Sequence, residues 1–232
     1  MFRFVYGLCI AATVFVGSSE VSSASIISGV TIHSVSSELR PASSGFDRRA
    51  NYIIDGSGFV AGQHTSNPNS TMWDADTFDP PLTAGGATDT APQIVFDLGA
   101  KYSISELLIW NYNAADFGGQ VFRTRSVRTM DVYTSMDGVT FDILGQYTLG
   151  IAPGADGYLG ETLDITDSTA RYVRFDLLSN YSTDGLTHGI GLSEVRFVQN
   201  TAVPEPTTIA IWSLLGLCGV GYGLRRKTKK TF

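Results

Sequence analysis

The sequence predicts an all-β fold in which two antiparallel sheets pack against each other. Short segments rich in Val, Ile, Tyr and Phe recur through the middle of the chain, separated by clusters of Gly, Asn, Asp and Ser. Several of them alternate with a period of two, as Val173, Phe175 and Leu177 do with the charged residues between them. No segment has the pattern of a long amphipathic helix, and strands do not alternate with helices, which favours a sandwich over an α/β fold.

Eight strands are expected in this middle part. They cover residues 26–35, 93–98, 104–110, 129–135, 140–149, 162–165, 170–177 and 191–198. Asp137 and Gly138 form a hairpin signal between two of them. Residues 36–92 and 111–128 contain little regular pattern, and long loops in a compact domain are usually functional or disordered. These two segments are therefore candidates for the functional surface.

The N-terminal segment is predicted to lie outside this fold. Arg3 is followed by an apolar run at residues 4–16, and small side chains stand at Ser22 and Ala24. This pattern is typical of a secretory signal peptide, here residues 1–24 with cleavage after Ala24. A membrane-spanning anchor is the alternative, but the apolar run is much shorter than the roughly 20 residues that a span needs.

The C-terminal segment has three parts in a fixed order. Residues 201–206 contain the Val-Pro-Glu-Pro box, residues 207–224 predict a transmembrane helix, and residues 225–232 hold five Lys and Arg. The positive-inside bias places that basic tail in the cytoplasm. A plain single-pass anchor is one alternative, and a lipid-anchor tail is another, although such tails usually end in apolar residues.

This C-terminal arrangement resembles the PEP-CTERM sorting signal. The resemblance implies a bacterial host of the Gram-negative type with an exopolysaccharide system, and recognition by an exosortase. It further implies a precursor anchored in the inner membrane and a product exported to the cell surface or the extracellular matrix.

Charge and cysteine content change once both ends are set aside. Residues 25–199 hold 10 Lys and Arg against 20 Asp and Glu, a net charge of 10 − 20 = −10. Cys9 and Cys218 both lie in the ends, so a disulfide cannot hold the exported part together. An acidic chain without a basic stripe argues against nucleic acid as a partner, and it is compatible with neutral sugars and divalent cations.

A series of motifs in the middle part carries a second resemblance. In order they are ANYIIDG at 50–56, TMW at 71–73, QIVFDLG at 93–99, the strand at 104–110, YTSMDG at 133–138, ARYVRF at 170–175 and LSEVRF at 192–197. The series is similar to the discoidin, or coagulation-factor type C, domain, whose galactose-binding-like jelly roll is shared with family 32 carbohydrate-binding modules. It implies a jelly-roll β-sandwich over residues 25–200. The segment 57–70 is longer than in many relatives.

A calcium site is the first candidate. Calcium takes six to eight oxygen ligands, and Asp55 stands before a glycine that permits a sharp turn. The resemblance implies a structural calcium ion held by Asp55, Thr71, Glu194 and nearby carbonyls. In the alternative interpretation Asp55 caps a turn and Glu194 pairs with an arginine.

A sugar-binding surface is the second candidate. Such a surface needs an exposed aromatic ring beside planar polar groups. By resemblance it lies on loops at one end of the sandwich, and the loops offer His64, Asn67, Asn69, Trp73, Asn111, Tyr112, Asn113, Phe117, Arg123, Arg125 and His188. The alternative is that Trp73 belongs to the core and that the asparagines serve turns.

Catalysis has little support in the sequence. The chain has no His-rich metal spacing, no nucleophile elbow and no phosphate-binding glycine loop. We therefore expect an exported, non-catalytic adhesion module that binds an extracellular glycan or exopolysaccharide. The alternative is an acidic envelope or matrix scaffold without a specific sugar ligand.

Overall fold

A computed structural model describes residues 22–40, 47–183 and 185–202. The predicted signal peptide, the linker, the membrane span and the basic tail lie outside the described residues, apart from a few residues at their borders. Among the described residues, no helix is long and apolar enough to cross a membrane. The chain divides into two units, Ala24–Thr201 and a second that joins Met1–Ser23 with Ala202–Phe232.

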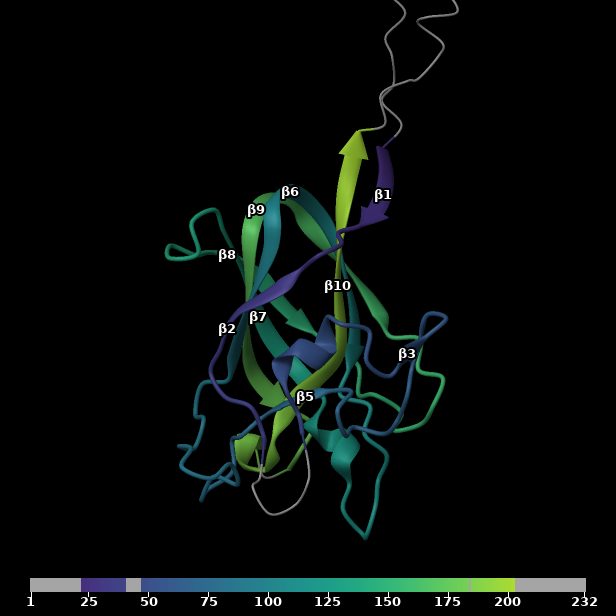
Figure 1. Ribbon diagram of the computed structural model, residues 1–232, viewed down its shortest axis with the longest axis vertical. Helices are drawn as coiled ribbons and strands as arrows, with labels where there is room; N and C mark the ends of the chain where they lie inside the picture. Colours follow the sequence, from purple (N-terminus) through teal and green to yellow (C-terminus); the bar gives the residue numbers. More distant parts are fainter. Residues whose placement is uncertain (1–21, 41–46, 184, 203–232) are drawn as a thin grey trace, which may run out of the picture. The chain divides into compact units, whose positions relative to one another are not determined.

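The unit Ala24–Thr201 is built from strands, which confirms the predicted all-β class (Figure 1). One hydrogen-bonded sheet runs in the order β1-β10-β6-β9-β7-β8, with β2 added to β6 and β5 added to β10. The strand bounds are β1 Ser22–Ile26, β2 Thr31–Val35, β5 Trp73–Ala75, β6 Gln93–Asn111, β7 Val127–Ser135, β8 Asp142–Thr148, β9 Glu161–Asn180 and β10 Ile190–Ala202.

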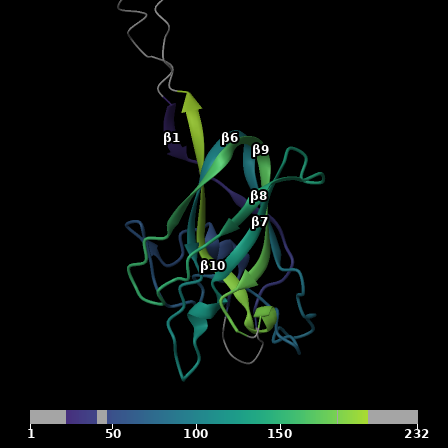
Figure 2. The same cartoon turned by 180° about the vertical axis from the view of Figure 1, so that it is seen from behind.

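The long strands β6 and β9 make two layers out of this one sheet (Figures 1 and 2). Near Phe96, β6 pairs with β2 on one side and with Val173 of β9 on the other. Near Leu107, it pairs with β10 and with Leu163, at the opposite end of β9. The register shifts between these halves mark irregularities where both strands change layer. The result is a jelly-roll sandwich with β7 and β8 in one layer and β5 and β10 in the other.

The core fills the space between the two layers. Phe96 lies 5.1 Å from both Phe175 and Phe197, measured between ring centroids, with the rings edge to face. Phe96 and Phe175 come from the layer of β7, and Phe197 comes from β10 in the other layer. All three side chains are fully buried. Aromatic contacts of this kind add to the free energy gained by burying apolar area, so they tie the layers together.

The observed strands differ from the predicted ones in how they are joined. The predicted strands 93–98 and 104–110 are one strand, β6, and 162–165 with 170–177 are one strand, β9. The predicted strand 26–35 is instead two strands, because the chain turns at Gly29, where φ is +75°. Glycine tolerates that left-handed conformation at little cost.

The segment predicted as long loops holds short elements. These are the 3-10 helix η1 (Ala50–Ile53), the small sheet of β3 (Phe59–Val60) with β4 (Gln63–His64), and β5. Two further 3-10 helices lie in the loops before β7 and β10, η2 at Phe122–Arg125 and η3 at Gly185–His188. β5, η2 and η3 gather at one end of the sandwich, the lower end in Figure 1, opposite the ends of β1 and β10.

Candidate functional site

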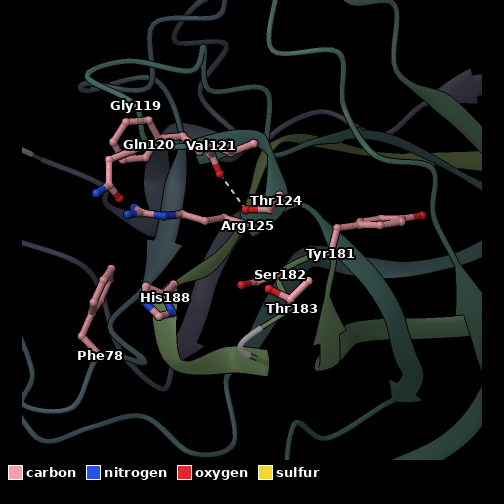
Figure 3. A pocket seen from close by; sticks show the side chains of 11 residues that line it. Phe78, Gly119, Gln120, Val121, Thr124, Arg125, Tyr181, Ser182, Thr183 and His188 are labelled. Atoms are coloured by element: carbon pink, nitrogen blue, oxygen red, sulfur yellow. Dashed lines mark hydrogen bonds between the residues drawn. The ribbon is translucent and has the colours of Figure 1, made fainter.

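A hollow of about 380 Å³ opens at this loop end of the sandwich (Figure 3). We call it the loop-end hollow. Its lining comes from three segments far apart in the sequence. They are Phe78, which lies three residues after the end of β5, the η2 turn with the residues before it, and the loop from β9 to β10. The lining residues are Phe78, Gly119, Gln120, Val121, Phe122, Thr124, Arg125, Tyr181, Ser182, Thr183 and His188.

Arg125 forms the centre of one wall. Its guanidinium carbon lies 5.1 Å from the ring centroid of Phe78 and 4.9 Å from that of Phe122, so two aromatic rings contact it. His188 stands beside Phe78, with the two ring centroids 6.2 Å apart. The hollow therefore combines aromatic surface with nitrogen donors, and Figure 3 shows Arg125 and His188 on the same side of it.

Asp74 forms an ion pair with Arg125. Arg125 Nη1 donates to Asp74 Oδ2 at 2.6 Å, and the Asp74 side chain is fully buried. Burial raises the pKa of Asp74, while the charge of Arg125 lowers it. A Cβ on Gly189 would lie 2.7 Å from Asp74 Oδ1 and 3.0 Å from Arg125 Cδ. Gly189 therefore makes room for the close approach of this ion pair to the chain entering β10.

Backbone contacts fix the loops around this ion pair. The first residues of β10 pair with β5, with Gly191 opposite Asp74, so this pairing fixes the backbone of the residue that holds Arg125. The Tyr181 N–H donates to the Thr124 carbonyl at 2.9 Å, which joins the loop after β9 to the η2 turn. Thr124 Oγ1 in turn donates to the Val121 carbonyl at 2.6 Å, as drawn in Figure 3.

The structure brings together two of the sequence-predicted sugar contacts, Arg125 and His188. Arg123 is exposed but does not line the hollow, because it extends to an ion pair with Asp116 at 3.4 Å. Two neighbours in sequence, Arg123 and Arg125, thus have different surroundings. Asn67, Asn69 and Phe117 line a second, adjacent hollow.

Five other predicted sugar contacts are buried in the interior, so the prediction that they face a ligand is wrong and their role is structural. They are His64, Trp73, Asn111, Tyr112 and Asn113. Trp73 belongs to the core, and its Nε1 donates to the Ser37 carbonyl at 2.9 Å. Tyr112 Oη accepts a hydrogen bond from Arg48 Nε at 3.3 Å, and burial raises the pKa of Tyr112 to about 12.

The buried asparagines hold loops. Asn111 Nδ2 donates to the carbonyls of Val127 and Gly150, and its Oδ1 accepts from the Val127 N–H. Asn113 bonds in the same way to the loop around Gly154. His64 has its ring nitrogens 2.9 and 3.1 Å from two carbonyl oxygens, and burial lowers its pKa. These polar groups satisfy buried backbone groups and do not reach the surface.

Sequence reasoning missed most of the lining. Phe78, Gln120, Phe122, Tyr181, Ser182 and Thr183 were not among the candidates, because loop residues carry no periodic signal. The Gly118-Gly119 pair could have pointed to them. Both glycines have positive φ, as two-residue hairpin turns need, and the turn between Phe117 and Gln120 projects the latter into the hollow.

The predicted calcium ligands Asp55 and Glu194 line a third hollow, of about 290 Å³, which we call the Glu194 hollow. Glu194 is almost fully buried, and its Oε1 accepts from Arg196 Nε at 3.1 Å. Its other oxygen, Oε2, has no hydrogen-bond partner among the described residues. Burial raises the pKa of Glu194 to about 7; the Arg196 charge opposes this rise and that of Asp55 adds to it.

Thr71, the third predicted ligand, is not part of that lining, and its hydroxyl donates to the Asn67 carbonyl. The Asp55 carboxylate accepts the Ser57 N–H at 2.8 Å, as a turn cap does. No group of three or more His, Cys, Asp and Glu residues that could hold a metal occurs in the described part of the chain. A cation in the Glu194 hollow would therefore need carbonyl or water ligands beside two carboxylates.

Comparison with known proteins identifies the C-terminal segment. Residues 202–227 match the PEP-CTERM protein-sorting motif. The chain therefore carries the signal of an exported protein that is sorted to the cell envelope, and the motif implies processing by an exosortase. This confirms the predicted sorting signal. No curated protein matches the chain.

Several solved structures are similar in fold, and two of the three described next carry the name of a family 32 carbohydrate-binding module. The CBM32-3 module of a family 31 glycoside hydrolase from Clostridium perfringens is 15% identical, with a TM-score of 0.53 over 76% of this chain and 94% of that one. The C-terminal domain of a Bacteroides fragilis chitobiase is 17% identical, with a TM-score of 0.51 over 78% and 100%. CpGH89CBM32-5 from Clostridium perfringens, bound to GalNAc-β-1,3-galactose, is 15% identical, with a TM-score of 0.51 over 75% and 99%. At these identities the likeness shows the fold, and it confirms the predicted jelly roll.

Proposed function

We propose that the chain is an exported, non-catalytic module that binds a carbohydrate in the loop-end hollow. The observation that carries this proposal is Arg125, held by Asp74 and contacted by two phenylalanine rings at the wall of an open hollow. Sugars offer C–H faces to aromatic rings and hydroxyls to planar donors, and both kinds of partner are present here. The fold shared with CBM32 modules adds support, since one of those structures holds GalNAc-β-1,3-galactose.

The lining favours binding over turnover. Glycoside hydrolysis uses a pair of carboxylates on either side of the scissile bond. The described lining of the loop-end hollow contains no Asp or Glu side chain. Asp74 lies beneath Arg125 with its carboxylate buried, so it cannot approach a glycosidic bond. A scaffold role without a specific sugar is the second candidate, supported by the acidic composition alone.

The loops that line the hollow lie at the end of the sandwich opposite the end of β10 (Figure 1), and the sorting motif begins at Ala202, the last residue of β10. We infer that the precursor is held in the inner membrane by residues 207–224 of a Gram-negative-type cell until an exosortase acts. The product then reaches the surface or the exopolysaccharide matrix. The tail joins the sandwich at residue 202, at the end of β10 and not at the loops that line the hollow.

A glycan array with the fragment 24–201 tests the carbohydrate proposal. We expect binding to a restricted set of glycans, and a loss of about tenfold or more in His188→Ala, because His188 offers both a ring face and polar nitrogens to the hollow. Arg123→Ala is the matched control, since Arg123 is exposed two residues from Arg125 and does not line the hollow. Its binding should equal that of the unmodified fragment.

Three outcomes would contradict the proposal. If the fragment unfolds cooperatively, and so is folded, but binds no glycan of the array, the scaffold role is favoured. Equal loss in His188→Ala and Arg123→Ala would place any binding outside the loop-end hollow. Release of sugar from the array glycans would indicate an enzyme.

We further propose that a structural calcium ion occupies the Glu194 hollow, with Glu194 and Asp55 as its carboxylate ligands. The unpartnered, buried Glu194 Oε2 supports this, because a buried carboxylate oxygen without a partner is costly. A cation there would supply charge compensation and would fix the turn at Asp55 against β10. Thr71 would have no part in it.

The expected result is a melting temperature that falls on chelation at pH 8 and depends on Glu194. Calcium at about 100 times its dissociation constant would stabilise the folded state by about 2.7 kcal/mol. Protons compete for Glu194, whose pKa is raised to about 7, so the effect of a chelator should shrink at pH 5.5. Thermal denaturation with and without EDTA measures both.

Glu194→Gln should remove the chelator effect, and Asp164→Asn, an exposed acid on β9, should keep it. Without calcium, the raised pKa makes the protonated folded state the more stable one. Stability should therefore decrease as the pH rises through 7 in the parent chain and not in Glu194→Gln. If EDTA does not change the melting temperature of the parent chain at pH 8, the proposed calcium ion is contradicted.

A further inference from the structure

A second hollow lies beside the loop-end hollow and is more apolar. It has a volume of about 250 Å³, and its walls include Leu39, Pro68, Leu82 and Phe117. The Phe117 side chain is 80% exposed, so its ring is accessible to a ligand in this hollow. Asn67 and Asn69 add exposed amide groups to this lining.

The two hollows share one wall. Phe122 and Arg125 line both of them, so a molecule in one hollow reaches the other across a single pair of side chains. Arg125 is the residue that Asp74 fixes by its ion pair, and Phe122 stacks against it. The dividing wall is therefore held by an ion pair and an aromatic contact, and it is the same wall that carries the proposed function.

One hairpin tip serves both hollows. Phe117 and Gln120 exchange two backbone hydrogen bonds, of 3.2 and 3.0 Å, around the Gly118-Gly119 turn. Phe117 lines the second hollow, while Gln120 lines the loop-end hollow. The turn thus fixes one contact residue for each hollow at a set spacing, as two adjoining subsites require.

The volumes of the two hollows also favour one ligand that occupies both. Pockets that enclose a small ligand usually measure about 300–1,000 Å³. The second hollow is below that range by itself, and the loop-end hollow is near its lower limit. Joined across Phe122 and Arg125, they fall well within it.

We propose that the second hollow is a subsite for the next sugar unit of the same glycan chain, so that the protein recognises at least two linked sugars rather than a single terminal one. This inference rests on the proposed carbohydrate function. The ring of Phe117 would cover the less polar face of the second unit, and Arg125 would contact both units. The exposed amides of Asn67 and Asn69 would meet its hydroxyls.

The test uses the full chain in a zwitterionic, non-glycosidic detergent. The probes are glycans of the array, grouped in series. Each series consists of one monosaccharide and of the di-, tri- and tetrasaccharides that have this monosaccharide as their terminal unit. For the series that binds, we expect the oligosaccharides to bind about tenfold or more tightly than the monosaccharide. Phe117→Ala should remove that gain and leave the affinity for the monosaccharide unchanged. Because Phe117 is exposed, the substitution leaves the core intact.

Two comparisons keep the outcomes distinct. Val139→Ala, which truncates another exposed apolar residue away from both hollows, should behave as the parent chain. His188→Ala should weaken monosaccharide and oligosaccharide alike. Equal affinities along the series, or full oligosaccharide affinity in Phe117→Ala together with loss in His188→Ala, would overturn the second subsite and leave the proposed function standing. Absence of binding to every series would overturn both.

Discussion

Replacing Arg125 by methionine is expected to destabilise the domain by about 3–5 kcal/mol, the usual cost of removing one partner from a buried ion pair. Methionine keeps much of the apolar contact with Phe78 and Phe122 but leaves the carboxylate of Asp74 without its nearest counter-charge. The size of the loss follows from the burial of Asp74, since an ionised group without a partner cannot be solvated there.

Urea denaturation at two pH values measures this prediction. Burial raises the pKa of Asp74 even beside Arg125, and the rise should be larger in the variant. A carboxylate whose pKa is raised by folding contributes stability that is lost as the pH rises, so the deficit of Arg125→Met should shrink in acid. The double variant Arg125→Met with Asp74→Asn should recover part of the loss. A deficit that does not depend on pH and that the double variant does not relieve would contradict the buried-pair interpretation.

Replacing Gly191 by alanine is expected to destabilise the domain by about 3 kcal/mol, the upper end of typical overpacking costs. A Cβ at this position would lie 2.0 Å from the Trp73 carbonyl oxygen and 3.0 Å from the Cα of Asp74. Both are backbone atoms of β5, so no side-chain rotation can relieve the contact. β5 would have to move away from β10, and Asp74 would move with it.

The matched control is Gly150→Ala, because a Cβ there would meet only Glu161 Oε1 at 3.9 Å. Thermal denaturation should show a large decrease for Gly191→Ala and a small change for Gly150→Ala. Since β5 positions the ion pair below the loop-end hollow, Gly191→Ala should also weaken glycan binding under conditions where it remains folded. Equal stability of the two variants would mean that β5 does not pack on β10 as described.

The architecture could be predicted because alternation is a local property of the sequence. Val173 and Phe175 face the core and Arg174 does not, as the period of two indicates. The continuity of β6 could not be predicted, because the residues near Gly99 read as a loop, and Gly99 has a φ of +82°, yet the strand continues through it. Strand pairing across the sheet, a long-range property, decides that outcome.

The candidate site could be predicted only in part, for a related physical reason. Loop polarity does not distinguish an asparagine that binds a ligand from one that satisfies buried backbone groups, and Asn111 and Asn113 do the latter. Arg123 and Arg125 look alike in the sequence, and only the position of Asp74 separates them. The hollow itself is formed by three segments whose proximity is set by β5, β7 and β10 together.

The most direct test of the central claim is an NMR titration of the ¹⁵N-labelled fragment 24–201 with the strongest glycan of the array. Binding in the loop-end hollow predicts shift changes concentrated at the amides of residues 119–125 and 181–188. Changes concentrated instead around Asp55 and Glu194, or spread evenly over the sandwich, would contradict it.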